Sequence, residues 1–323
     1  MKKIDVLLPD RIGDSVLSIP AVICLKQLIE KYTDESYKVR LISSSPMTPI
    51  FKALNLFEVK QLTPFLKLNS YFYNSDVGIC LYTSSKSMFY HSKCLCGEVY
   101  PYKKRIKFDI DMPYLDLNNM HKILDKKFLD FMHNEKGLAY CAIRYFGICL
   151  ESGFTPEQIM ETYSMEKIEV GNFSDWTNPI LNENYFVYCM EAAYGTKNDK
   201  DRRWEPEYHF EIASKAVEKT GYKCVFLGID NSIELPQNPS FIDMRKKLSL
   251  VETAKLIQYS QGYVGNDTGP LHLANLFGKK SLACYFRTAS LTDYAPLFHD
   301  LNLKIVHPNT AEEVIEKFNF IFD

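Results

Sequence analysis

The sequence lacks both glycine-rich motifs that bind nucleotide phosphates in many α/β proteins. Neither G-x-G-x-x-G nor G-x-x-x-x-G-K-[ST] occurs, which argues against nicotinamide-dependent hydride transfer and against NTP-driven phosphoryl transfer. The chain also has little net charge, −2 for 323 residues, so nothing global points to nucleic acid as a partner. We find no repeat of fixed period between its halves.

Long hydrophobic runs are lacking as well. The N-terminal apolar run ends at Pro9 and Asp10, which is too short for a signal peptide or a membrane span, and we expect no later segment to cross a bilayer. Nine cysteines are scattered along the chain and, without an export signal, are expected to be reduced thiols in a cytoplasmic protein. Cys94 and Cys96 form the only close pair, and no second pair completes a zinc site, so we expect no metal.

What is present is an ordinary globular composition, with 46% hydrophobic and 24% charged residues, in a chain long enough for two domains. Strand-like and helix-like segments alternate in both halves. Strands are predicted near residues 4–9, 39–43, 77–82, 185–190 and 223–228, and helices near 20–31, 50–56, 117–133, 138–149, 207–220, 250–258 and 311–318.

This alternation predicts an α/β fold with two Rossmann-like domains that face each other across a cleft. We place the first domain at residues 1–172 and the second at 182–323. The stretch 171–179 is rich in Gly, Asn and Pro, which favours a domain boundary, and residues 171–182 are a plausible hinge.

Residues 262–286, GYVGNDTGPLHLANLFGKKSLACYF, predict a strand, a turn, a helix and a second strand. Asp267 or Thr268 is suited to cap the helix, and Pro270 to its first turn. Free N–H groups at such a helix start, beside Gly269, form an anion site that suits a nucleotide diphosphate. The alternative is a turn and helix cap that bind nothing.

The loop 9–15 follows the first predicted strand and so lies at the carboxyl edge of the first sheet. Asp14, next to Gly13, is placed to accept a proton from a substrate hydroxyl. Its alternative role is that of a helix cap. Asp10 is a second carboxylate in the loop but has no glycine neighbour and ranks lower.

Two basic segments are candidates for anion binding. The first is the loop 191–204, whose cations would reach a diphosphate unless Asp199 and Asp201 neutralise them in a solvated polar loop. The second consists of cations at residues 93–107 together with Arg144. It would bind a phosphorylated or carboxylated acceptor or contact anionic lipid, and the alternative is a solvated surface. The cations are Lys197, Lys200, Arg202 and Arg203 in the first segment, and Lys93, Lys103, Lys104, Arg105, Lys107 and Arg144 in the second.

Three segments together resemble glycosyltransferase family 9, the bacterial heptosyltransferases of lipopolysaccharide core synthesis. They are RIGDSVLSIPA at 11–21, DRRW at 201–204, and LSLVETAKLI with YVGNDTGPLHLANLFGKKSLACYF at 248–286. The resemblance implies a GT-B fold and an inverting, metal-independent transfer of heptose from ADP-heptose to a lipopolysaccharide or lipooligosaccharide core acceptor. It implies no cofactor, and a place in the cytoplasm with peripheral contact at the inner membrane.

The resemblance also implies roles for single residues. Asp14 matches the catalytic base, and Asp267 the acidic residue that contacts the donor sugar. In the segment that follows Asp267, the family's diphosphate-binding backbone matches Thr268, Gly269 and Pro270. The family's histidine close to the nucleotide matches His272.

Other matches are looser. Arg202 stands where the family usually has a lysine, which keeps the charge but changes its reach, and Leu248 stands where the backbone contacts adenine. We assign Thr196 to the donor site as well, and Glu234 is the candidate for the ribose-binding glutamate. Lys104, Arg105 and Arg144 are the candidates for acceptor binding.

Two alternative functions stay open. One is a related transferase that uses another nucleotide sugar or a non-lipid acceptor. The other is a two-domain binding or regulatory protein that kept the nucleotide site and lost catalysis.

Overall fold

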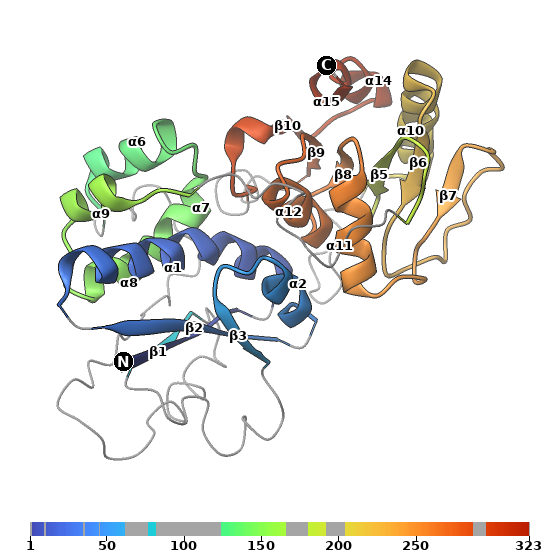
Figure 1. Ribbon diagram of the computed structural model, residues 1–323. Coiled ribbons are helices and arrows are strands. Elements are labelled where there is room, and N and C mark those ends of the chain that lie inside the picture. Colours follow the sequence, from blue (N-terminus) through green and yellow to red (C-terminus); the bar gives the residue numbers. More distant parts are fainter. Residues whose placement is uncertain are drawn as a thin grey trace. The chain divides into compact units, whose positions relative to one another are not determined.

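The computed structural model describes residues 2–9, 11–34, 36–44, 46–61, 77–81, 124–165, 180–191, 204–286 and 295–322. The chain divides into two compact units, Met1–Glu166 (unit 1) and Lys167–Asp323 (unit 2). Each unit is a parallel sheet with helices packed on it, so the predicted α/β class with two Rossmann-like domains is confirmed (Figure 1). Most of the predicted boundary and hinge, residues 171–182, lies outside the described residues.

The sheet of unit 1 has four parallel strands in the order β3-β2-β1-β4. Central strand β1 pairs Ile4 with Val39 on one side and with Val77 on the other. Strand β3 was not predicted, because most of its residues are polar. The strands are β1 (Lys2–Leu7), β2 (Tyr37–Ser43), β3 (Glu58–Gln61) and β4 (Val77–Cys80).

Helix α1, Ile12–Tyr32, begins well before its predicted start near residue 20. Asp14 therefore lies in the first turn of a helix, and the predicted loop over 9–15 is wrong for most of its length. The prediction treated Pro20 as a helix start, since an interior proline costs about 3 kcal/mol. Here Pro20 lies inside the helix, and buried neighbours such as Val16 and Val22 hold the turns on both sides in place.

The remaining described helices of unit 1 lie near α1 or at the strand ends. The single helix predicted over 138–149 consists of three short helical segments. The bounds are α2 (Thr48–Ala53), α6 (Lys126–Asn134), α7 (Tyr140–Ile143), η1 (Arg144–Phe146), α8 (Gly147–Glu151) and α9 (Pro156–Thr162).

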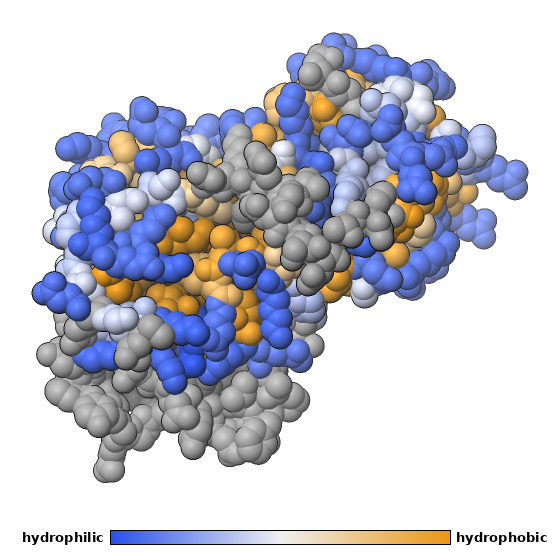
Figure 2. All heavy atoms as spheres, viewed as in Figure 1, coloured by the Kyte–Doolittle hydropathy of each residue, from blue (hydrophilic) through white to orange (hydrophobic). Residues whose placement is uncertain are grey.

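Helix α1 has 21 residues and contains an 18-residue window with a mean hydropathy of 1.5, so by length and composition it could cross a membrane. The expectation that no segment reaches this length is therefore wrong. However, 67% of its apolar window is buried inside the protein, as in the central helix of a packed domain. Figure 2 shows hydrophobic side chains gathered over α1 and the strands beside it.

The sheet of unit 2 has six parallel strands in the order β10-β9-β8-β5-β6-β7. All strands and helices predicted for this half are present, whereas β7 and β10 were not predicted. The strands are β5 (Tyr185–Cys189), β6 (Lys223–Phe226), β7 (Phe241–Asp243), β8 (Tyr263–Asn266), β9 (Ser281–Tyr285) and β10 (Asn302–Val306). The helical segments are α10 (Pro206–Thr220), α11 (Leu250–Tyr259), α12 (Gly269–Leu276), η4 (His299–Leu301), α14 (Ala311–Ile315) and α15 (Asn319–Phe322).

Strands β5 and β8 approach each other closely at Gly265. A Cβ atom at this position would lie 2.1 Å from the Cys189 carbonyl oxygen, and the backbone φ is +139°, a conformation open to glycine. The core beside these strands is aliphatic and aromatic, with Tyr188, Phe226 and Leu282 fully buried.

Candidate functional site

The strand order of unit 2 reverses between β5 and β8, because the chain runs outward through β6 and β7 before it returns to β8. Such a reversal leaves a crevice outside the carboxyl ends of the two strands, where ligands bind in open α/β sheets. Two contacts join these ends. Asn266 Nδ2 donates to the Met190 carbonyl at 2.8 Å, and Thr268 Oγ1 donates to Cys189 Sγ at 3.6 Å. The predicted diphosphate turn, residues 267–270, begins here.

Helix α12 starts as predicted, with Thr268 as the N-cap and Pro270 in the first turn. The Thr268 side chain makes no capping bond to the helix, and its Oγ1 lies 3.2 Å from the Tyr263 hydroxyl. Leu271 N–H bonds to the Thr268 carbonyl at 3.1 Å, and proline has no N–H. Gly269 is the first residue of the helix, where a backbone N–H has no intrahelical acceptor and lies at the positive end of the helix dipole, which suits an anion.

Asp267 and His272 lie together beside this helix start. They are 5% and 4% exposed, and Asp267 Oδ1 is 3.8 Å from His272 Nε2. A carboxylate repels a diphosphate but accepts hydrogen bonds from hydroxyl groups. Asp267 is thus suited to hydrogen bonds from sugar hydroxyls and the helix start to phosphate, and the roles that the resemblance implies for them stay predictions.

A pocket with an empty volume of about 390 Å³ lies in unit 2 and is lined by residues that follow β5, β6 and β7, together with the start of α10. The side chains that line it are both apolar and polar, and the polar ones were not predicted as site residues. They are Glu191, His209, Asp230, Ser232 and Arg245.

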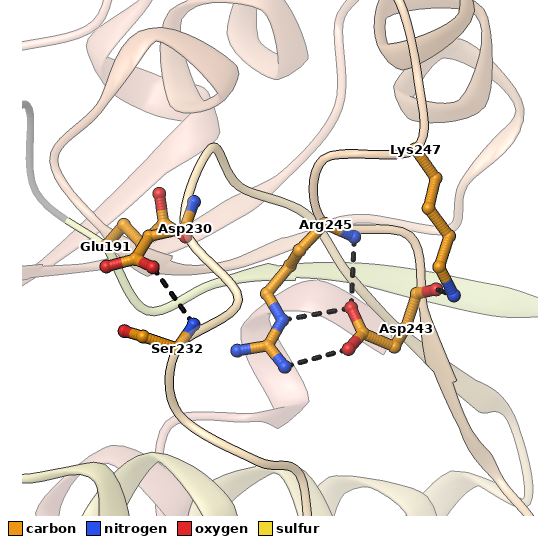
Figure 3. Close-up of polar contacts among 6 residues, drawn as sticks. All are labelled: Glu191, Asp230, Ser232, Asp243, Arg245 and Lys247. Atoms are coloured by element: carbon orange, nitrogen blue, oxygen red, sulfur yellow. Dashed lines mark hydrogen bonds and ion pairs between the residues drawn. The ribbon is translucent and has the colours of Figure 1, made fainter.

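Arg245 is the largest fully buried side chain of the described residues, with 1% exposed. Its Nε and Nη2 donate to the two carboxylate oxygens of Asp243 at 2.9 and 2.8 Å, as Figure 3 shows. This bidentate pair holds the pKa of Asp243 below its usual value. The third nitrogen, Nη1, is buried and has no hydrogen-bond partner within the described part of the chain.

His209 is the second buried polar group of the pocket. Its Nδ1 lies 2.9 Å from the Tyr188 hydroxyl, and its Nε2 has no partner among the described residues. Burial lowers the pKa of His209 to about 3, so the imidazole is neutral at physiological pH.

Glu191 is held by the backbone that follows β6. Its carboxylate oxygens accept hydrogen bonds from Ile229 N–H at 2.8 Å and Asp230 N–H at 2.7 Å. Burial raises the pKa of Glu191, and these two bonds oppose the rise. Gly228 makes room for the carboxylate, because a Cβ at this position would lie 2.2 Å from Glu191 Oε1.

In unit 1 the strand order reverses between β1 and β4, and Asp14 lies in the first turn of the helix that follows β1. Its Oδ1 accepts a hydrogen bond from Arg144 Nη2 at 3.3 Å, and both side chains are 13% exposed. Arg144 Nη2 also donates to the Tyr145 hydroxyl at 3.2 Å. Arg144 thus contacts the predicted base, although we had assigned it to acceptor binding.

Two residues predicted for donor binding are not among those that line the pocket. Leu248 is partly buried just before α11 and does not line the pocket, and neither does the exposed Glu234. Within the described ranges no three His, Cys, Asp or Glu side chains come together as metal ligands. The predictions for Lys104, Arg105, Thr196 and Arg202 fall outside the described residues.

His209 is the pocket residue that a sequence signal reveals. It is buried together with Ile212, Ala213 and Ala216, the i, i+3, i+4, i+7 spacing of an inward helix face. Arg245 gives no such signal, because it stands in the basic run Arg-Lys-Lys, which is typical of a solvated surface. Glu191 gives none either, because its partners come from another strand end.

The sequence profile of glycosyltransferase family 9 (heptosyltransferase) matches residues 150–312, about half of the chain. No curated protein sequence matches it. Among solved structures, the chain is similar to ADP-heptose lps heptosyltransferase II of E. coli, with a TM-score of 0.65 and 16% identity over 100% of this chain and 99% of that one. It is also similar to the glycosyl transferase family 9 protein of Veillonella parvula DSM 2008, with a TM-score of 0.62 and 14% identity over 99% and 97%.

A third structure, E. coli heptosyltransferase WaaC with ADP, gives a TM-score of 0.55 and 11% identity over 98% and 99%. These likenesses extend over both units, and they show the GT-B fold that was predicted.

Proposed function

The chain belongs to glycosyltransferase family 9 and is a glycosyltransferase, and from this premise we propose that it transfers heptose from ADP-heptose to a lipopolysaccharide or lipooligosaccharide core acceptor. The observation that carries the proposal is the uncapped start of α12 beside the buried Asp267, at the strand reversal of unit 2. The family match supports this donor, and so does the likeness to an ADP-heptose heptosyltransferase and to a heptosyltransferase with ADP.

Donor binding then uses two kinds of group. The Gly269 N–H and the dipole of α12 take the diphosphate, and the Asp267 carboxylate accepts hydrogen bonds from the sugar hydroxyls. We propose that Arg202 and Thr196 add contacts to the diphosphate and that backbone at Leu248 contacts the adenine.

The chemical step is a single displacement with inversion. Asp14 takes the proton of the acceptor hydroxyl as its oxygen attacks the anomeric carbon of the donor. The bond from that carbon to the diphosphate oxygen breaks, and ADP leaves with the electron pair. The helix start stabilises the charge that develops on the departing diphosphate, so the proposed reaction needs neither metal nor cofactor.

The acceptor and the place of reaction follow from the same assignment. A glycolipid core is made where its lipid lies, so we propose a cytoplasmic protein in peripheral contact with the inner face of the inner membrane. Lys104 and Arg105 are the proposed contacts to acceptor phosphate or carboxylate groups.

Transfer by the purified protein is the direct test. We expect ADP-heptose and a heptose-deficient core acceptor to give ADP and a product whose mass is larger by one heptose, with an inverted anomeric configuration by NMR. The same reaction with EDTA is expected to proceed at an unchanged rate.

Two other outcomes would replace the proposal. Tighter binding of UDP or GDP than of ADP in calorimetry would identify a transferase of another nucleotide sugar. Clean nucleotide binding without turnover on any acceptor, and without donor hydrolysis, would identify a protein that has lost catalysis.

A further inference from the structure

The pocket beside β5, β6 and β7 contains a buried cation with unused donors. Arg245 is 1% exposed, and the bidentate bond to Asp243 fixes its guanidinium, so Nη1 keeps one position. A buried N–H group without a partner costs about 1–3 kcal/mol, so such a group calls for an explanation, and a ligand that accepts its hydrogen bond supplies one. In Figure 3 the unbonded nitrogen points away from Asp243, toward the side where Ser232 and Glu191 lie.

The charges around the pocket argue against a second phosphate site. Arg245 is the only cation among the described lining residues, and the Asp243 carboxylate offsets its charge. Glu191 and Asp230 add two carboxyl groups, while His209 is neutral with a pKa of about 3. Within the described lining, a phosphate dianion would meet net negative charge and would be repelled. A neutral polar group fits better.

The apolar part of the lining fits a flat ring. Met190, Trp204 and Ile233 line the pocket next to the polar groups. Ile233 is 40% exposed and Ile229, on the same loop after β6, is 67% exposed, so apolar surface is available for a ligand to cover.

We propose that Arg245 is a specificity-determining residue of the donor site, whose Nη1 group donates hydrogen bonds to an acceptor atom of the nucleobase. The inference rests on the proposed function, because it takes this pocket as the place of the donor's nucleoside. A base that presents a ring nitrogen or carbonyl oxygen to Nη1 is held, and a ligand without a base loses this contact.

Binding of two ligands that differ only in the base tests the inference. We would measure ADP and ribose 5-diphosphate by calorimetry, on the full chain without acceptor, for the wild-type protein and for Arg245→Met. In the wild type the base should strengthen binding markedly. In Arg245→Met we expect the Kd for ADP to rise about 10- to 100-fold and the Kd for ribose 5-diphosphate to stay within about twofold, because only the base contact is lost.

Lys247→Met is the matched control. Lys247 Nζ donates to the Asp243 carbonyl at 2.6 Å, but the side chain is exposed and does not line the pocket. Its loss removes a cation from the same neighbourhood, and both ligands should bind as they do to the wild type.

The comparison of the two ligands also distinguishes base recognition by Arg245 from a purely structural role. If Arg245→Met weakened both ligands equally, the coupling between base and side chain would be zero and the inference would be overturned. An unchanged Kd for ADP would overturn it as well. If the wild type binds UDP or GDP better than ADP, the same pair of measurements applies to that nucleotide. A protein that shows the coupling but no heptosyl transfer would retain the inference and lose the proposed function, whereas one that binds no nucleotide would lose both.

Discussion

Arg144 Nη2 donates to Asp14 Oδ1 at 3.3 Å within unit 1, so the residue proposed as the base has a partly buried cationic partner. Burial alone would lower the pKa of Arg144, but the neighbouring Tyr145 and Asp14 raise it above its usual value, which keeps the guanidinium charged at any working pH. A charged partner favours the ionised carboxylate, the form that accepts a proton.

Asp14→Asn should abolish transfer and leave the donor affinity nearly intact. The amide keeps the shape of the side chain but does not accept the acceptor proton, and we expect kcat to fall at least about 100-fold. Steady-state kinetics and calorimetry with ADP measure the two effects. Turnover retained within tenfold would contradict the assignment of Asp14 as the base.

Arg144→Met should reduce kcat about 10- to 100-fold with little change in the Kd for ADP, because it acts on the position and charge of Asp14. The acidic limb of the pH profile should move to higher pH, since the carboxylate loses its cation, and Arg144→Lys should restore part of the rate. Lys31→Met, which breaks the exposed pair with Glu161 in the same unit, is the control and should leave both values unchanged. A change in KM for the acceptor alone would instead support the original assignment of Arg144 to acceptor binding.

Gly228→Ala should destabilise unit 2 by about 1–3 kcal/mol, because its Cβ displaces the Glu191 carboxylate from the N–H groups of Ile229 and Asp230. Glu191→Ala removes the same hydrogen bonds and should cost a similar amount. The double variant should be no less stable than Glu191→Ala, since the clashing group is gone. Urea unfolding measures all three, and additive losses would show that Gly228 acts through something other than Glu191.

Local chemistry explains what the sequence predicted. Thr268 at the cap and Pro270 in the first turn are recognisable from neighbouring residues alone, and the structure places both as expected. The apolar runs of β5 and β8 are equally local. Strand β7 was missed, because it has three residues that are only partly buried, and its place depends on pairing with β6.

The pocket could not be predicted in the same way, because its groups meet only through the order of the strands. Arg245 is buried because Asp243, at the end of β7, takes two of its nitrogens. Glu191 follows β5 and finds its partners after β6. The Asp243–Arg245 pair is local, because the two residues are two positions apart. The Glu191 pairs join residues 38 and 39 positions apart, a spacing that no motif records.

His209 should make stability depend on pH. Its folded-state pKa of about 3 lies below the ordinary value of 6.5, so the unfolded chain binds the proton first as pH falls. The stabilisation is complete above pH 6.5 and is lost as pH falls toward 3, by about 2 kcal/mol between pH 6.5 and 5. Urea unfolding at these two values should show this loss, and His209→Gln should have a shallower dependence.

The control for His209 is His307→Asn. His307 is exposed, and asparagine tolerates its positive φ of 47°, so this variant should keep the pH dependence of the wild type. If the unfolding free energy of His209→Gln depended on pH as it does in the wild type, His209 would not be the group that titrates.

Gly265→Ala should be far more damaging than an alanine at another left-handed glycine of unit 2. The new Cβ would lie 2.1 Å from the Cys189 carbonyl oxygen, a backbone atom of the neighbouring strand that has no room to move, and φ is +139°. Gly221→Ala is the matched control, because φ is +70° and nothing lies within 4 Å. It should cost about 1–2 kcal/mol from conformation alone, whereas Gly265→Ala should lose several kcal/mol or fail to fold. Equal losses in urea unfolding would show that the close approach of β5 and β8 contributes nothing beyond the backbone conformation.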